Sequence, residues 1–405
     1  MQGNVFDAIR STCSEAIKDS ADVQIIDDEV TKFVSKIDIS EMKNVEKRRF
    51  PLKFTSRQEI NFIATLDVLN FGSGFRVPLH KYQKRGAYET IVFGCMGMFI
   101  THGDITADIM INMSLSEIAS VFDITMQEDY ELQPGIHSMR DTELRPLAES
   151  LKSVLNECGS ILRNRQCKDF AQFIDETLSA KPKSTAGKSD DKDRKYMAAD
   201  LVYALVTSFP AFNDRYELSA KQIPSVETAS SATSASASAS VPASASGTSS
   251  SSASPSAAMD TADEKNSTKL TVFVFKKAQL LAGDLYHRFH DEDKRFQWAD
   301  LDRMTIFSDN VVPAVLRHFG ILKLSSRLQK IIDSNQVLTD VKMECQLRAA
   351  AIVVCDRIVA KFNDSAPAGS KRLLAEELDY YLWQYGKKPE ATKVCRHATR
   401  ETVYY

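Results

Sequence analysis

The chain of 405 residues is long enough for one large domain or two domains of ordinary size. Hydrophobic residues make up 43% of it and charged residues 26%, proportions that are typical of a globular protein with a packed core. The net charge of −3 and the isoelectric point near 6.2 argue against a broad basic surface for nucleic acid or acidic membranes, but they allow a local basic pocket.

The sequence also constrains compartment and metal chemistry. The N-terminal residues show no basic segment followed by an apolar run, and no uninterrupted apolar stretch approaches the length of a membrane span. The seven cysteines are scattered without a CxxC pair, which is typical of reduced thiols, so we expect an intracellular, cytoplasmic protein. His287 and His290 are the closest histidine pair with helical spacing and lack further nearby ligands. We therefore expect no metal site and no cofactor.

Helical periodicity dominates the N-terminal half, where apolar residues recur every three or four positions. The predicted helices cover residues 5–48, 59–69, 114–122, 144–159, 168–178 and 197–209. The apolar, glycine-bearing stretch 88–98 predicts a tightly packed buried element. Gly72 and Gly74 follow the helix over 59–69, where they either cap its end or let the backbone approach a neighbour or ligand closely.

Two stretches in the middle of the chain lack a core-forming pattern. Residues 180–193 are rich in lysine and aspartate and predict an exposed loop. Residues 222–267 form an Ala/Ser-rich tract without the apolar mass to offset the entropy of ordering, so we predict a disordered insertion. This insertion would divide a single domain into an N-terminal part, 1–221, and a C-terminal part, 268–405.

After the insertion, residues 271–275 predict a short strand that leads directly into a helix over 276–286. Asp309 or Asn310 stands where the helix through Leu316 needs its N-cap, with a proline in the first turn. Gly320 separates that helix from the next, in a pattern that faintly resembles the helix-hairpin-helix of DNA glycosylases. A long helix is predicted over 342–362. Because strand signals are few and short, the predicted fold class is mainly α.

The run 373–386 predicts a helix with a buried stripe, which Gly386 ends. Asp379 and Trp383 are four residues apart and share a face beside that stripe. Burial raises the pKa of a carboxyl group unless a partner stabilises its charge, so Asp379 invites a functional interpretation. A partly exposed or salt-bridged carboxylate is the simpler alternative, and periodicity does not separate the two.

Several short segments, taken in order, resemble the queuosine salvage family of queuosine 5′-phosphate N-glycosylases/hydrolases. The segments are residues 50–54, 67–75, 208–212, 275–279, 305–309 with 312–313, 378–383 and 404–405. Each is weak alone, but their ordered combination is specific. The resemblance implies a helical fold related to helix-hairpin-helix DNA glycosylases. It also implies cleavage of the N-glycosidic bond of queuosine 5′-monophosphate, which releases queuine for reuse in tRNA modification.

The resemblance further implies roles for single residues. Asp379 matches the catalytic carboxylate, which would stabilise positive charge on the ribose or position the attacking water, with a covalent adduct as the open alternative. Phe307, Ser308 and Asp309 match the segment that binds the base, and Trp383 matches the far side of the pocket. Two aromatic rings can stack on a flat 7-deazaguanine while a carboxylate accepts its N–H groups.

Other positions depart from the family or have weaker support. Gln384, beside the motif tryptophan, stands where some animal members carry an acid, and Phe50 stands where they carry histidine. Residues 309–311 are Asp-Asn-Val in place of Asp-Tyr-Arg. All three positions are expected near the substrate. The 5′-phosphate needs cations, for which Lys276 or Lys277 is the nearest candidate, although both could instead lie on a solvated surface.

Two other functions stay open at this point. A nucleic-acid-binding protein or DNA glycosylase is favoured by the hairpin after Leu316, but the net charge of −3 and the absence of a basic helix face oppose it. A non-catalytic helical scaffold is favoured by the many amphipathic helices. The queuosine salvage interpretation predicts a small-molecule substrate, with no membrane partner and no stable nucleic-acid partner, and the oligomeric state is left open. It also predicts that Asp379, Phe307, Asp309 and Trp383 converge on one pocket.

Overall fold

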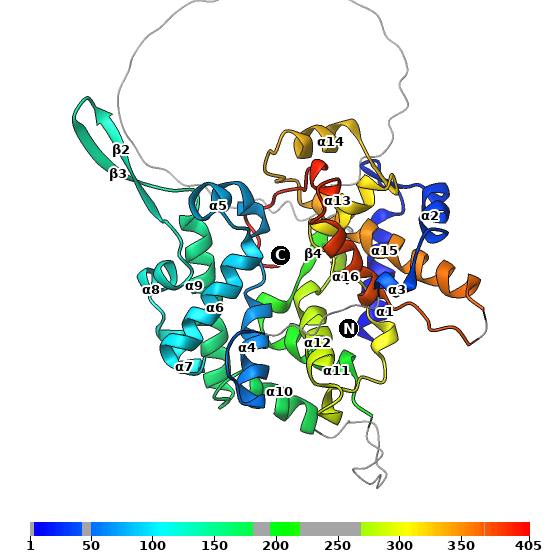
Figure 1. Ribbon diagram of the computed structural model, residues 1–405, viewed down its shortest axis with the longest axis horizontal. Coiled ribbons are helices and arrows are strands. Elements are labelled where there is room, and N and C mark those ends of the chain that lie inside the picture. The colour runs from blue at the N-terminus through cyan, green and yellow to red at the C-terminus, as the bar shows by residue number, and fades with distance from the viewer. Residues whose placement is uncertain (1–3, 43–49, 181–194, 219–268, 368) are drawn as a thin grey trace, which may run out of the picture. The chain divides into compact units, whose positions relative to one another are not determined.

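The computed structural model describes residues 4–42, 50–180, 195–218, 269–367 and 369–405 (Figure 1). The chain divides into two units, one of residues 1–216 with 271–405 and the other of residues 217–270. The predicted Ala/Ser insertion at 222–267 and nearly all of the predicted loop at 180–193 lie outside the described residues. All the helices described below belong to the first unit.

The mainly α prediction is confirmed for the described residues. The N-terminal part contains α1 (Val5–Ile17), α2 (Asp27–Val34), α3 (Ile39–Met42), α4 (Ser56–Val68), α5 (Arg76–Gln83), α6 (Ala87–His102), α7 (Ala107–Asn112), α8 (Leu115–Val121), α9 (Arg145–Asn164), α10 (Phe170–Ser179) and α11 (Ala198–Ser208). The C-terminal part contains α12 (Lys276–Phe289), α13 (Val311–His318), α14 (Ser326–Asp333), α15 (Val341–Ser365) and α16 (Ala375–Tyr385). Among the described residues, no helix is both long and apolar enough to cross a membrane.

In the described parts of the chain, the strands are short and form three two-stranded sheets. They are β1 (Val23–Ile25) with β6 (Leu322–Leu324), β2 (Gln127–Gln133) with β3 (Ile136–Asp141), and β4 (Arg215–Leu218) with β5 (Leu270–Phe273). The predicted strand at 271–275 is therefore confirmed in part, and the helix after it begins at Lys276 as expected.

The prediction of continuous helix over 5–48 is wrong where β1 interrupts it. Val23 pairs with Leu324 and Ile25 with Leu322, so the strand is formed by a partner almost three hundred residues away, which local periodicity does not show. Strand β6 also lies between α13 and α14, inside the predicted helix-hairpin-helix. The resemblance of that region to DNA glycosylases stays a prediction. The β2–β3 hairpin was not predicted, because its mostly exposed polar residues carry no alternating apolar signal.

Two helices organise the part of the fold that carries the pocket. Helices α4 and α11 pack against α12, while α1, α13 and α16 pack against α15. Every residue of α15 from Met343 to Cys355 is buried, so this stretch of the helix is enclosed on all sides. Residues along α12, at the start of α13 and on one face of α16 line a common cavity. Figure 1 shows where these three helices lie in the fold.

The loop after α4 packs directly against the segment 397–405. Gly72 has a φ of 95°, in the left-handed region, and its amide donates to the carbonyl of Tyr405 at 3.1 Å. A Cβ atom at Gly74 would lie 2.1 Å from the carbonyl oxygen of Thr399. Close backbone approach, one of the two interpretations of these glycines, is therefore confirmed. The neighbour is the segment 397–405, which reaches the pocket at Tyr405.

Candidate active site

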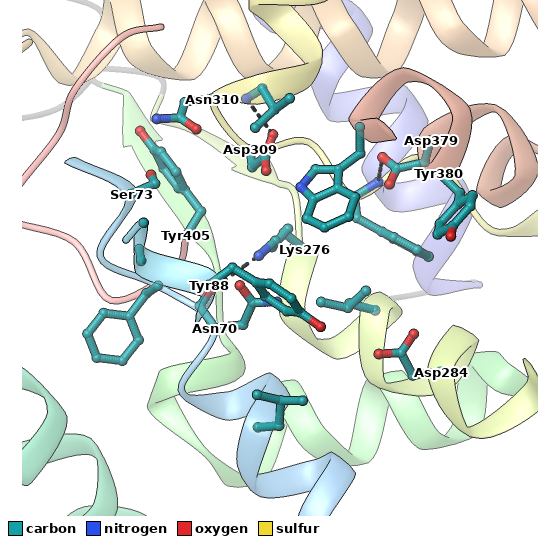
Figure 2. Close-up of a pocket in the computed structure, with 18 of the residues that line it drawn as sticks. Asn70, Ser73, Tyr88, Lys276, Asp284, Asp309, Asn310, Asp379, Tyr380 and Tyr405 are labelled. Carbon is teal, nitrogen blue, oxygen red and sulfur yellow. Dashed lines mark hydrogen bonds between the residues drawn. The ribbon is translucent and has the colours of Figure 1, made fainter. Parts of the chain in front are cut away.

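A cavity of about 440 Å³ lies within the first unit, and its walls come from segments far apart in sequence. Its lining residues lie on α4, on the following loop with α5, at the start of α6, on α12, in the loop before α13, on α16 and at Tyr405. Figure 2 shows Asp309 and Asp379 with Lys276 around this space. Among the described residues, no group of three or more His, Cys, Asp or Glu side chains could hold a metal ion.

The structure brings five of the predicted site residues together. Phe50, Phe307, Asp309, Asp379 and Trp383 all line the cavity, although they are spread over more than three hundred positions. A helical scaffold does not require this convergence of two carboxylates and three aromatic rings, whereas a pocket for a flat, polar ligand does.

Asp379 lies on the buried face of α16 with 8% of its surface exposed. Its Oδ1 accepts a hydrogen bond from the backbone amide of Phe307 at 2.8 Å. Burial, together with the negative charge of Asp309, raises the pKa of Asp379 to about 7, although the Phe307 amide and the charge of Lys276 act in the opposite direction. This carboxyl group can therefore gain or lose a proton near neutral pH.

Asp309 both caps a helix and lines the cavity, the two placements that the sequence suggested for it. Its Oδ1 accepts hydrogen bonds from the amides of Val311 at 2.6 Å and Val312 at 3.2 Å, so it caps the first turn of α13. It also lines the cavity. The two amides and the helix dipole stabilise a negative charge on this carboxylate.

Of the two adjacent lysines Lys276 and Lys277, Lys276 is the one that lines the cavity. Its Nζ donates to the carbonyl of Asn70 at 3.2 Å (Figure 2). Burial lowers the pKa of this ammonium group, while the negative charges of Asp309, Asp67 and Asp379 raise it. A cation in this position balances part of the charge of Asp309 and Asp379.

Lys277 does not line the cavity. Successive residues on a helix point about 100° apart, so only one of the two lysines can face the space. The Nζ of Lys277 donates instead to the carbonyls of Val68, at 2.6 Å, and Val403. Burial, with the neighbouring charge of Lys276, lowers the pKa of Lys277 to about 7. Even the neutral amine has two N–H groups, enough for both carbonyls.

Two other predicted residues lie just outside the cavity. Ser308 is completely buried, and its Oγ donates to the carbonyl of Arg348 at 3.0 Å, so its side chain faces away from the space. Gln384 donates through Nε2 to the hydroxyl of Tyr380 at 2.9 Å, and it is Tyr380 that lines the cavity. Gln384 can therefore act on a ligand only by orienting that phenol.

Aromatic side chains form a large part of the walls. Tyr88 contacts Trp383 edge to face, with ring centroids 5.6 Å apart, and the ammonium group of Lys387 lies 3.4 Å from the centroid of Trp383. Phe50 packs against Phe62 with centroids 4.8 Å apart. Because both the apolar faces and the ring edges are fixed by neighbours, the walls are suited to a flat ring.

Sequence reasoning did not find the basic and polar side chains on the rest of the wall. Arg76, His80, Lys387 and Arg396 all line the cavity. Burial lowers the pKa of Arg396, as does the nearby charge of Arg76, while Asp309 acts in the opposite direction. Arg76 directly follows one of the family-like segments and could have been noticed there, but no pattern marks the other three.

A histidine–carboxylate pair also lies at the wall. The Nε2 of His287 is 2.6 Å from Oε2 of Glu376, and both residues line the cavity. Glu376 precedes Asp379 by one helical turn on α16, and its charge contributes to the raised pKa of Asp379. The pair joins α12 to α16, the helix that carries Asp379.

Residues 259–405 match a family model described as queuosine salvage protein. A relative from Dictyostelium discoideum, named queuosine 5′-phosphate N-glycosylase/hydrolase, is 31% identical over 33% of this chain and 40% of its own length. Relatives with the same name from Mus musculus and Bos taurus are 28% and 20% identical. They cover 64% and 87% of this chain, and 59% and 83% of their own lengths, respectively.

The match to the Dictyostelium discoideum protein thus spans two fifths of that relative, and the match to a Sphaerobacter thermophilus relative of the same name spans 39% of its length. The matched C-terminal residues include Asp379, Phe307, Asp309 and Trp383, the residues on which the first resemblance depended. The family match and the shared name of these relatives show that the chain is similar to queuosine salvage proteins, most clearly over residues 259–405.

Proposed function

We propose that this protein hydrolyses the N-glycosidic bond of queuosine 5′-monophosphate and releases the base queuine. The observation that supports this proposal most strongly is the convergence of Asp379, Asp309, Phe307 and Trp383 on one cavity. A cavity of about 440 Å³ is within the size range of small-molecule sites. The family model described as queuosine salvage protein matches residues 259–405, which contain all four residues, and the chain is similar to relatives named for this reaction.

Asp379 is the proposed catalytic carboxylate. As the bond between the ribose carbon and the base nitrogen breaks, positive charge develops on the ribose, and a fixed carboxylate in a dry site stabilises it. The water that attacks the ribose carbon loses a proton to the carboxylate of Asp379, and this proton is passed on to the departing base, so one water is consumed and the carboxylate is regenerated. The burial of Asp379 and the amide of Phe307 fix the orientation of the group before substrate binds.

The base is proposed to lie between Phe307 and Trp383. Stacking on the two rings would hold its flat ring system, and Asp309 would accept hydrogen bonds from its N–H groups. Asp309 keeps one oxygen on the amides of Val311 and Val312, so its second oxygen is available for such contacts at a fixed position.

The cations that line the cavity suit the 5′-phosphate better than Lys277 does. Arg76 and Arg396 are close enough for their charges to interact, and His80 and Lys387 line the same cavity. Such a group of cations is a favourable site for a phosphate. Lys276 lies near the carboxylates, where its charge supports catalysis more directly than phosphate binding.

Replacement of Arg396 by Gln is expected to raise the KM for the nucleotide by about tenfold or more, because one charge-assisted contact to phosphate is lost. Binding of free queuine, which has no phosphate, should change little in isothermal titration calorimetry. Arg400→Gln is the matched control, because Arg400 pairs with Glu143 and does not line the cavity. Equal weakening of nucleotide and queuine binding by Arg396→Gln would contradict the assignment.

The value of kcat/KM is expected to rise with pH through a midpoint near 7 and then level off, because the ionised form of Asp379 is the active one. Replacing Asp309 by Asn should move this midpoint to lower pH, because the Asp309 charge raises the pKa of Asp379. The substrate phosphate titrates near pH 6 in both enzymes and stays fixed. If the pH midpoint of kcat/KM were the same in Asp309→Asn as in wild type, the rise of kcat/KM with pH would have to be assigned to a group other than Asp379.

The direct test is to incubate the purified protein with queuosine 5′-monophosphate and to follow free queuine by mass spectrometry. Time-dependent release that is proportional to enzyme concentration is expected. No release by the wild-type protein would overturn the proposal. Salt-dependent binding to duplex DNA in a mobility-shift assay, without release of queuine, would favour the nucleic-acid-binding alternative instead.

A further inference from the structure

We propose that the buried ion pair between Arg348 and Asp214 is the positioning unit of this active site. The pair lies behind the cavity and does not touch ligand space, so neither residue is a catalytic residue. It holds three separate pieces of the wall: the start of α12 with Lys276, the loop that carries Phe307 and Asp309, and Tyr405. The inference rests on the proposed function, which supplies the reaction that the unit serves.

The ion pair itself is fully enclosed. Neither side chain has any exposed surface, and the contact is bidentate, with Nη1 to Oδ1 at 2.9 Å and Nη2 to Oδ2 at 2.6 Å. A buried charge pair is retained only when further hydrogen bonds satisfy its remaining donors and acceptors. The remaining hydrogen bonds of Arg348 and Asp214 therefore identify the segments that the ion pair fixes in position.

Asp214 holds the start of α12. Its Oδ2 accepts from the amide of Lys276 at 3.3 Å, and its backbone carbonyl accepts from the amides of Val274 at 3.0 Å and Phe275 at 3.1 Å. Phe275 has a φ of 50° and a ψ of 40°, a left-handed conformation that is uncommon for an aromatic residue. Such backbone persists only where its surroundings fix it, and it turns the chain so that Lys276 enters the cavity.

Arg348 holds the loop that carries the base-binding candidates. Its Nε and Nη2 donate to the carbonyl of Ser308 at 3.0 Å and 2.8 Å, and the Ser308 hydroxyl donates back to the carbonyl of Arg348. Ser308 lies between Phe307 and Asp309, which point into the cavity. Fixing this one peptide therefore fixes both side chains, and with them the amide that bonds to Asp379.

The third part of the cavity wall is Tyr405. The Cζ atom of Arg348 lies 4.4 Å from the centroid of the Tyr405 ring, so the guanidinium group stacks on the ring. The hydroxyl groups of Tyr405 and Tyr216 both donate to Oε1 of Glu344, at 2.9 Å and 2.7 Å. Nη1 of Arg348 also donates to the hydroxyl of Tyr216 at 2.7 Å. With this bond, all five N–H groups of the guanidinium are used, an arrangement that a lysine cannot reproduce.

The positioning role of Arg348 is tested by comparing kcat, KM and the pH profile of base release between the wild-type enzyme and Arg348→Lys. We expect Arg348→Lys to lower kcat at least about fiftyfold with KM changed less than about threefold, because the groups near the reacting bond are misplaced rather than removed. The pH midpoint should also move, because the charges of Lys276 and Asp309 near Asp379 change position. Thermal unfolding, followed by circular dichroism, gives the folded fraction at the assay temperature.

The matched control is Arg10→Lys. Arg10 pairs with Asp356, also on α15, and donates to the carbonyls of Arg303 and Met304, but none of these four residues lines the cavity. We expect its kcat to stay within about threefold of wild type and its pH midpoint to stay in place. If Arg348 had a purely structural role, Arg348→Lys would behave like Arg10→Lys. Its pH midpoint would stay in place, and any loss of kcat would equal the fraction of unfolded protein.

If Arg348→Lys does not fold, the double variant Asp214→Leu/Arg348→Met carries the test, because replacing a buried ion pair by apolar side chains of similar volume is often neutral for stability. We expect it to fold and to lose at least about fiftyfold in kcat. Either folded variant with a kcat within threefold of wild type and an unmoved pH midpoint would overturn the inference. An inactive wild type would instead overturn the proposed function.

Discussion

Asp379→Asn is expected to lower kcat for base release about a thousandfold while the protein stays folded. The amide keeps the volume of the carboxylate and can still accept the Phe307 amide at the position of Oδ1. It carries no negative charge, however, and it cannot take a proton from water. Loss of one preorganised electrostatic contact alone typically costs about 10² to 10³ in kcat, and general base catalysis adds to it. Single-turnover release of queuine measures the chemical step.

The same variant should be more stable than wild type at alkaline pH. The pKa of Asp379 is raised in the folded state to about 7 from its ordinary value of 3.8. The folded protein therefore keeps the proton where the unfolded chain has released it, so this group lowers stability progressively as pH rises from about 4 to 7. The side-chain amide of the variant does not titrate in this range. The Tm advantage of the variant over wild type should thus be larger at pH 8 than at pH 5.

Glu377→Gln is the control on the same helix. Glu377 pairs with Lys371 at 3.1 Å and accepts the amide of Leu374 at the start of α16, and it does not line the cavity. Its kcat should remain within about threefold of wild type. Full activity of Asp379→Asn, or an equal loss in both variants, would remove Asp379 from the catalytic role.

The helices could be predicted because burial of one face leaves a periodic record in the sequence. The run 373–386 predicted α16, and the helix over 276–286 predicted α12 from its first residue. Strand β1 could not be predicted, since its stability comes from pairing with residues 322–324. A pairing between residues about three hundred positions apart has no local signal.

The candidate site could be predicted only where a residue belongs to a recognisable segment. Asp379, Phe307, Asp309 and Trp383 were found through such segments, and all line the cavity. Arg396 was missed because an isolated arginine in a loop resembles any solvated cation, and its burial depends on the packing of distant elements.

Asp309 shows why a structural role and a functional one should not be treated as exclusive. Its position before α13 favoured a helix cap, and the family-like segment favoured contact with the base. One carboxylate oxygen caps the helix through Val311 and Val312, and the residue lines the cavity as well. Capping fixes the side chain in one rotamer, which is what a group that must recognise a ligand requires.

Lys276→Met and Lys277→Met, at adjacent positions, are expected to have opposite effects. Lys276→Met should lower kcat/KM about a hundredfold with little loss of stability, because it removes the buried cation that interacts with Asp309 and Asp379. The positive charge of Lys276 lowers the pKa of Asp379, so its removal should move the pH midpoint of kcat/KM above 7. The measurements are steady-state kinetics across pH and thermal unfolding of each variant.

Lys277→Met should instead leave kcat per folded molecule and the pH midpoint nearly unchanged. It removes the two hydrogen bonds that hold the carbonyls of Val68 and Val403 together, and buried carbonyls without partners cost about 1–3 kcal/mol each in stability. The neutral amine already satisfies both carbonyls, so the function of Lys277 lies in its N–H groups and not in a charge offered to phosphate. A large rise in the KM for the nucleotide in folded Lys277→Met would contradict this and return Lys277 to the phosphate site. A stable, fully active Lys276→Met would remove the cavity cation from catalysis.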